Sequence, residues 1–328
     1  MEVLYEMNST KKLTEAALLT SLFIVITIIA VGTGIGYAAY LDFAVPIFFC
    51  IILLKCDFKY TVLSSISALL IVSLVLGNIG TAIWISQSII IGILCGVLLT
   101  KNTSIIDDFV YGSIIGVMLM VFVDIYGSTL IGYSFMEEFQ GYANMLKNPK
   151  FINIVFYTFI ALLPMGTIFC VYFLSLILGK KLNLLKVNSK KKLYMMSNFK
   201  TCGRYMCCSK KVFYTCASYI LFIEILNLFG VKFEQTYIKT ILISSEYVCL
   251  YFVIRDAFIL VQNYLLIKYN KVSYLRILSI VVFLSLIFSF KITTAVLVII
   301  NIILDKKIDI RIKQNIIVDN YVNKLIYR

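Results

Sequence analysis

The sequence predicts an all-α protein, a polytopic bundle of transmembrane helices, on three observations. Of its 328 residues, 61% belong to the hydrophobic set AVILMFWYC and 14% are charged, whereas a soluble chain has roughly 45–50% apolar and about 25% charged residues. The mean hydropathy is +0.96. The apolar residues also gather into stretches that approach or exceed the length of about 20 residues needed to cross the hydrocarbon layer. Such a chain is expected to be an integral membrane protein.

Nine apolar stretches define the predicted membrane segments, and the ninth is interrupted by Lys291. A cation at the centre of a single span would cost about 2.5–3.5 kcal/mol. We therefore expect two short segments there, ten in all, with Lys291 at an outer turn or extending towards it; a re-entrant hairpin over 277–304 stays open. In order, the stretches are 14–36, 39–54, 60–76, 81–99, 109–131, 151–178, 212–229, 240–266 and 277–304.

The distribution of Lys and Arg predicts the orientation. With the N-terminus in the cytoplasm, 24 of the 30 cations fall on the cytoplasmic side, as the positive-inside rule requires. An even number of crossings also keeps the basic tail inside. We expect a multi-pass protein of the bacterial cell membrane with both termini cytoplasmic. The net charge of +13 then reflects membrane orientation, and no nucleic-acid partner is expected.

Composition divides the chain into four parts: a six-span unit over 1–179, a basic cytoplasmic loop over 180–211, a smaller C-terminal membrane unit over 212–304 and a basic tail over 305–328. The loop holds ten cations. It is interpreted first as an orientation signal; binding of anionic headgroups or of a partner protein stays open. In the first unit, Gly92 and Gly96 form one of three small-xxx-small pairs, which are expected to serve close helix packing.

The chain contains no histidine, which excludes His-based metal sites, Ser-His-Asp and Cys-His triads and imidazole proton relays. Walker A, GxSxG, HExxH and Rossmann motifs are also absent from the sequence. We expect no enzymatic activity, no cofactor and no metal. Four cysteines in and after the basic loop lack the paired spacing of zinc sites and are interpreted as reduced thiols, with metal binding, redox sensing or acylation as alternatives. They are Cys202, Cys207, Cys208 and Cys216.

Five polar or aromatic residues of the first unit fall on its predicted outer side: Asp42, Asn78, Trp84, Gln87 and Asp124. Aromatic walls with a few convergent polar groups are typical of a small-molecule pocket. An aromatic belt at the membrane interface would place Trp and Tyr at the same depth without any ligand. Both interpretations stay open, and the five residues are the candidate ligand-binding set.

A second polar cluster lies in the C-terminal unit and comprises Glu224, Glu246, Arg255 and Asp256. Ionisable groups inside spans are costly and therefore mark candidate sites. One interpretation pairs Arg255 with Glu224 or another carboxylate to fix helix register. The other is an ion or proton route along Glu246 and Asp256.

The opening from Lys11 to Leu22, KKLTEAALLTSL, followed by an apolar helix, resembles the start of the substrate-binding S components of energy-coupling-factor transporters. Six spans, a basic loop, C-terminal spans and the ending Ile308-Asp309-Ile310-Arg311 together resemble the YybS-type family of bacterial membrane proteins of unknown function. The resemblance implies that small residues of the first helix dock on a membrane coupling subunit. The matching positions here are Ala16 with Thr20 and Ala17 with Ser21.

Two functions follow as hypotheses. The first is a non-enzymatic, S-component-like subunit that binds a small solute from the outer side, with energy supplied by a separate ATPase on the coupling subunit. The alternative is a membrane scaffold or regulatory protein that holds a partner through the basic cytoplasmic loop.

Overall fold

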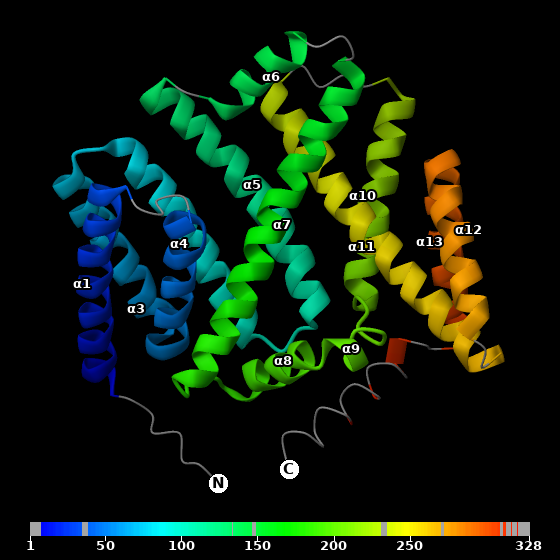
Figure 1. Cartoon of the computed structure of the whole chain (residues 1–328), viewed down its shortest axis with the longest axis horizontal. Coiled ribbons are helices and arrows are strands. Elements are labelled where there is room, and N and C mark those ends of the chain that lie inside the picture. Colours follow the sequence, from blue (N-terminus) through cyan, green and yellow to red (C-terminus); the bar gives the residue numbers. More distant parts are fainter. Residues whose placement is uncertain are drawn as a thin grey trace. The chain divides into compact units, whose positions relative to one another are not determined.

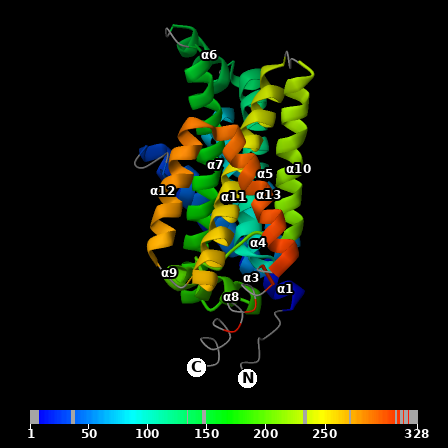
Figure 2. The ribbon, with the colours of Figure 1, turned by 90° about the vertical axis from the view of Figure 1, so that its right-hand side faces the viewer.

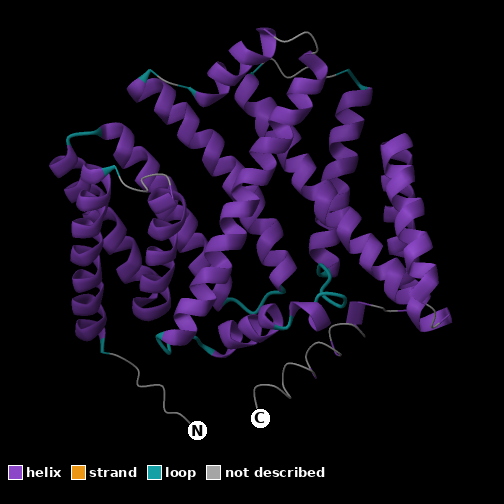
Figure 3. Ribbon diagram, viewed as in Figure 1, coloured by secondary structure: helices purple, strands orange, loops and turns teal. Residues whose placement is uncertain are grey.

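The computed structural model describes residues 8–34, 39–132, 134–145, 149–230, 235–269, 272–308, 311–312, 316 and 320. Every regular element in these residues is a helix, as Figures 1 and 3 show. The prediction of an all-α polytopic helix bundle is therefore confirmed. Asp309 and Ile310 of the sequence motif at the end of the chain lie outside the described residues.

Six of the described helices are long and apolar enough to cross a membrane, which makes the chain a multi-pass membrane protein. Each of the six contains or largely covers one predicted span. They are α1 (Ser9–Thr33), α4 (Ile79–Thr100), α5 (Ile105–Ile131), α7 (Pro149–Lys181), α10 (Lys210–Leu228) and α11 (Thr236–Tyr269).

The chain forms two compact units, and each is described by itself. Unit 1 comprises residues 1–102 and 115–190, and unit 2 comprises residues 103–114 and 191–328. The predicted division at residue 179 differs from this, because the beginning of α5 belongs to unit 2. The physical reason lies in Asp107 and Asp108, whose carboxylates accept hydrogen bonds from Ser209 N and Lys192 Nζ.

In unit 1, α1 and α4 pack against α3 (Val45–Leu76). Phe23 of α1 meets Phe49 edge to face, with ring centroids 4.9 Å apart. A Cβ added at Gly92 of α4 would lie 2.3 Å from the carbonyl oxygen of Pro46. The glycine therefore permits backbone contact between α4 and α3, within one unit.

The predicted spans 39–54 and 60–76 lie largely within α3, which is interrupted at Asp57 and preceded by the short π-helix η1 (Tyr40–Ala44). Asp57 has a φ of 69° and ψ of 167°, values at which the helix cannot continue. Its carboxylate pairs with Lys12 Nζ at 2.6 Å and with Lys186 Nζ at 3.5 Å. Asp57 lies between the two predicted spans, so the break in α3 is the turn that connects them. The ion pairs of its carboxylate hold this turn to Lys12 and Lys186.

The basic loop is partly helical, with α8 (Val187–Ser197) and α9 (Phe199–Cys202). Lys192 is buried, and its Nζ lies 2.7 Å from the Asp108 carboxylate. Burial lowers the pKa of Lys192 from its ordinary value, although the charge of Asp108 opposes this. One of the ten predicted loop cations is therefore a core residue of unit 2 instead of a solvent-exposed charge.

The last predicted region forms α12 (Val272–Phe288) and α13 (Phe290–Ile308), which contact each other and meet at the turn between them in Figure 2. At 1.5 Å per residue they are about 26 Å and 29 Å long. The break falls at Ser289, two residues before Lys291, so the predicted interruption coincides with a turn. Both helices pack on α11 within unit 2.

Candidate functional site

Unit 1 contains a cavity of about 300 Å³ between α4, α5 and α7, closed further by residues of η1 and the first turn of α6 (Phe135–Met145). This volume lies at the lower end of the range for small-molecule pockets. Each long helix contributes residues spaced three, four or seven apart, which is one helical face. The faces are Ile83, Trp84, Gln87, Ser88 and Ile91 of α4; Met120, Val123, Asp124, Gly127 and Ile131 of α5; and Phe159, Leu163, Pro164 and Thr167 of α7.

The structure brings four of the five candidate ligand-binding residues to this cavity: Asp42, Trp84, Gln87 and Asp124. They come from three different elements, far apart in the sequence. Asn78 has another role, because its side chain accepts a hydrogen bond from Thr81 N at 3.1 Å and caps the beginning of α4. Asn78 thus positions α4, the helix that carries Trp84 and Gln87.

Gln87 has a side-chain oxygen, Oε1, that is buried without a hydrogen-bond partner among the described residues. A buried acceptor left unpaired costs about 1–3 kcal/mol. Gln87 lines the cavity as a residue, although its Oε1 atom is itself covered by protein.

Asp124 caps the N-terminal end of α6. Its Oδ1 accepts a hydrogen bond from Phe135 N at 2.8 Å, and its Oδ2 accepts one from Ser134 Oγ at 2.8 Å. Ser134 Oγ in turn accepts a hydrogen bond from Glu137 N. A carboxylate is favourable at a helix N-terminus, where backbone N–H groups are unpaired. Asp124 therefore holds the first turn of α6 at the cavity, in addition to lining it.

The charge at the cavity is of one sign. Asp42 and Asp124 are the carboxylates among its described lining residues, and no Lys or Arg lines it. Aromatic faces of Trp84, Phe135 and Phe159 complete the wall. Carboxylates accept hydrogen bonds, and aromatic faces attract cations, so the cavity is suited to a ligand with donor groups or positive charge.

Sequence reasoning missed the contributions of α6 and α7 and most of α5. The segment over 135–145 was expected to be part of an outer loop, and the structure gives it a helix. Phe159, Leu163 and Thr167 recur at four-residue intervals, a signal for one face of α7, but an apolar membrane helix shows this spacing on its lipid side too. The signal could not identify the cavity face.

The docking candidates on α1 fall on two different faces. Ala16 and Thr20 are 1% and 5% exposed and face the core of unit 1, with Thr20 Oγ1 donating to Ala16 O at 2.7 Å. Ala17 and Ser21 are exposed. Ala16 and Thr20 are therefore occupied by packing within the unit, and only Ala17 and Ser21 remain accessible to another subunit.

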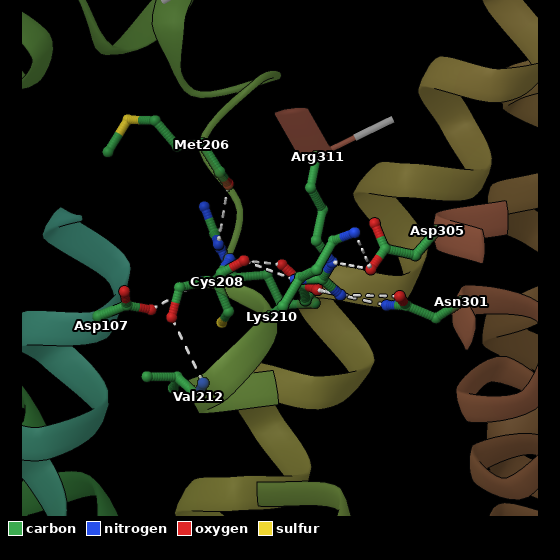
Figure 4. A network of polar contacts seen from close by, with 11 residues as sticks. Asp107, Met206, Cys208, Lys210, Val212, Asn301, Asp305 and Arg311 are labelled. Carbon is green, nitrogen blue, oxygen red and sulfur yellow. Dashed lines mark hydrogen bonds and ion pairs between the residues drawn. The ribbon is translucent and has the colours of Figure 1, made fainter. Parts of the chain in front are cut away.

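In unit 2, Asp256 binds three members of a buried polar network, and Figure 4 shows these partners, Cys208, Asn301 and Arg311. Its Oδ2 lies 2.6 Å from Arg311 Nη2, and its Oδ1 accepts a hydrogen bond from Cys208 N at 2.7 Å. Arg311 also donates to Cys208 O at 2.5 Å and to Asn301 Oδ1 at 2.7 Å. Asp256 and Arg311 are 0% and 2% exposed, so this cation of the predicted basic tail is a core residue.

The expected pairing of Arg255 with Glu224 is wrong. Glu224 Oε2 lies 2.8 Å from Lys291 Nζ, near the turn between α12 and α13. Arg255 instead donates to the carbonyl oxygen of Met206 at 3.4 Å. Glu246 is 8% exposed, and its side chain makes no hydrogen bond within the described part of the chain. The carboxylate route along Glu246 and Asp256 stays a prediction.

The four cysteines of the loop region are buried and reduced. Burial raises the pKa of Cys207 to about 12, so its thiol is protonated at neutral pH and is a poor nucleophile. Cys208 contributes to the network through its backbone N–H and C=O. Among the described residues, no three Cys, Asp or Glu side chains form a group that could hold a metal ion.

No protein-family model matches this chain, and searches of curated proteins and of solved structures likewise give no match.

Proposed function

We propose that the chain is a non-enzymatic membrane protein that binds a small solute in the cavity of unit 1, with an ammonium or other donor-rich group directed at the acceptors in its wall. The observation that carries the proposal is the cavity itself, which Asp42 and Asp124 line and where no Lys or Arg is present among the described lining residues. Solute entry from the outer side follows from the orientation predicted by the cations.

The proposal includes an S-component-like role, in which a separate ATPase and a membrane coupling subunit supply the energy. Support comes from the resemblance of the first helix and from Ala17 and Ser21, which are exposed on α1. Small residues allow close approach of a second helix in lipid. Within this proposal, Ala17 and Ser21 form the docking face, while Ala16 and Thr20 hold α1 in unit 1.

Trp84 offers a direct test because it is the single tryptophan of the chain and lines the cavity. Its fluorescence therefore comes from one position at the cavity, and because Trp84 is 47% exposed only a saturable change counts as binding. Phenylethylammonium, phenylethanol and phenylacetate have similar size and differ in charge. We expect the ammonium to change Trp84 emission saturably and phenylacetate to leave it unchanged, and we expect native mass spectrometry of protein purified from its membrane to retain a small organic molecule.

Two variants sharpen the test. Asp42→Asn removes one cavity charge without changing shape and should weaken the response to the ammonium. Glu137→Gln is the matched control, since Glu137 does not line the cavity. Asp124→Ala is not used in this test, because it would also remove the hydrogen bonds that hold the beginning of α6. If no probe changes the emission and no small molecule co-purifies, the proposal is wrong.

A second candidate function, a scaffold acting through the basic loop, is favoured by the exposure of Lys190, Lys200 and Lys211. Lys192 must be left intact in its test, because its loss would destabilise unit 2 directly. Replacement of the three exposed lysines by glutamine should abolish capture of a partner protein while the response of Trp84 to the cationic probe persists. Unchanged capture would exclude the scaffold function.

A further inference from the structure

Five side chains with hydroxyl, amide or carboxyl groups line the described wall of the cavity in unit 1. Two of them are hydroxyls that bond to their own helices: Ser88 Oγ donates to the Trp84 carbonyl oxygen at 3.2 Å, and Thr167 Oγ1 donates to the Leu163 carbonyl oxygen at 3.1 Å. The third, Gln87, is neutral, and its Oε1 is covered by protein. None of these three side chains carries a charge, so selection by charge depends on the two carboxylates.

The carboxylate of Asp124 is compensated by α6. It accepts hydrogen bonds from Ser134 Oγ and from two backbone N–H groups, those of Phe135 at 2.8 Å and Met136 at 3.4 Å. These are the first two N–H groups of α6, at the end of the helix where the backbone dipole favours negative charge. A solute cation at Asp124 would have to compete with all three donors. The charge of Asp124 is therefore balanced largely within the protein.

Asp42 has no such compensation. It lies in η1, and its side chain forms no hydrogen bond or ion pair within the part of the chain that the structure describes. It is exposed, so a solute in the cavity can reach its carboxylate. The element that carries it is held in place, because Tyr40 shares a hydrogen bond of 2.7 Å with Thr27 of α1 and η1 also contacts α4 and α7. Asp42 is thus a positioned carboxylate that still lacks a partner.

The aliphatic part of the wall offers no acceptor to a second charge. Ile91, Met120 and Val123 belong to this part. An ammonium group placed against such side chains would lose its water without gaining a hydrogen bond, which is costly. The wall therefore matches a solute that has one positive end, directed at Asp42, and an apolar body.

We infer that the cavity selects solutes with a single positive charge and that Asp42 is the residue that determines this specificity, whereas Asp124 is a positioning residue that holds α6. This inference rests on the proposed function, because it assigns roles within the same solute site. It narrows the ligand class from donor-rich solutes in general to monoammonium compounds with an apolar body.

Titrations of the purified full-length chain in detergent, followed by Trp84 emission, test the inference. The affinity for phenylethylammonium divided by that for phenylethanol gives a charge-selectivity ratio, and p-xylylenediammonium supplies two charges at similar size. We expect the wild type to bind the monoammonium more tightly than either other probe. Asp42→Asn should lower the ratio by about five-fold, the upper value for a partly exposed ion pair, and Asp42→Glu should keep it. Asp124→Asn should weaken both probes alike, because α6 is less firmly held, and leave the ratio unchanged.

The possible failures are distinguishable. If no probe changes the wild-type emission saturably, the proposed function fails together with the inference. If the wild type prefers the ammonium but Asp42→Asn keeps the ratio, Asp124→Asn loses it, or the diammonium binds as tightly as the monoammonium, the inference alone is wrong. If Asp124→Asn elutes as an aggregate, the two Asp42 variants and the diammonium decide, because Asp42 is exposed and its side chain makes no described hydrogen bond or ion pair that folding could lose.

Discussion

Two pairs of buried charges in unit 2 join segments distant in the sequence. Asp256 meets Arg311, and Asp108 meets Lys192, with all four side chains at most 4% exposed. Removal of one partner from such a pair leaves an uncompensated charge in a poorly solvated interior. The pairs therefore specify which segments pack together, and each residue depends on its partner.

We expect Arg311→Met to lower the free energy of unfolding by about 3–5 kcal/mol, because Asp256 would lose its cation and remain buried. A melting curve in detergent with a thiol-reactive fluorescent dye measures this, since the buried cysteines react as the protein unfolds. Lys200→Met, at an exposed position in the basic loop, serves as control. Its free energy of unfolding should stay within about 0.5 kcal/mol of the wild-type value. Equal midpoints for both variants would contradict the expectation.

Asp57 gives unit 1 a defined pH dependence. The hydrogen bond from Lys12 and the charge of Lys186 hold the pKa of Asp57 below its usual value. A carboxyl group whose pKa is lower in the folded state stabilises that state above its unfolded pKa, and this contribution disappears as the pH falls through the folded pKa. The stabilisation is therefore present at neutral pH and lost in acid.

Asp57→Asn tests this because Asn has nearly the same size and shape as Asp and carries no charge. We expect the variant to have a lower melting midpoint than the wild type at pH 7, and the two midpoints to converge below pH 4. A constant difference between the two proteins from pH 7 to pH 3 would show that the carboxylate charge is not responsible.

At the scale of elements, the helices of unit 1 are positioned by close backbone contacts and by caps. Gly92 permits the approach of α4 to α3, Asn78 caps the beginning of α4, and Asp124 holds the beginning of α6. All three features help to position the wall of the cavity, because α4 and α6 contribute residues to it. The shape of the cavity thus depends on residues that do not all face it.

Gly92→Ala should destabilise unit 1, by about 1–3 kcal/mol, because the added methyl group would overlap the Pro46 backbone and force the helices apart. Gly166→Ala in α7 is the matched control: a Cβ there has no neighbour within 4 Å, and alanine is the better helix former. Melting midpoints should fall for Gly92→Ala and stay or rise for Gly166→Ala. If Gly92→Ala left the melting midpoint unchanged, α4 would be able to move away from α3 without loss of stability.

At the scale of the whole molecule, the two units are interleaved along the chain. Residues 103–114, the beginning of α5 and its preceding turn, belong to unit 2, although the rest of α5 belongs to unit 1. Asp107 and Asp108 provide the contacts that place this segment. A cut between residues 179 and 180 would therefore divide unit 2, even though composition suggests a boundary there.

Co-expression of residues 1–179 and 180–328 as two chains should yield a complex, because the first chain carries Asp107 and Asp108 and the second carries Ser209 and Lys192. Affinity purification through a tag on one chain measures the recovery of the other. Asp108→Asn should lower this recovery, whereas Asp42→Asn, in a cavity whose described lining residues all lie on the first chain, should not. Independent purification of the two chains would contradict the interleaved arrangement.

Sequence by itself determined the helical class, the multi-pass membrane character and the position of most spans, because long apolar stretches have few other stable states in a bilayer. It also named Asp42, Trp84, Gln87 and Asp124, which the structure brings to one cavity. Such residues could be found because polar groups are conspicuous in apolar helices.

Only the tertiary structure decided which charges are partners. Arg255 and Glu224 are separate, Lys192 and Arg311 are buried although they lie in segments that read as basic and exposed, and Ala16 faces inwards while Ala17 does not. The physical reason is that ion pairs and cavity walls join residues up to 129 positions apart, as Asp57 and Lys186 are. Hydropathy and helical spacing describe each helix by itself and carry no information on which face meets which.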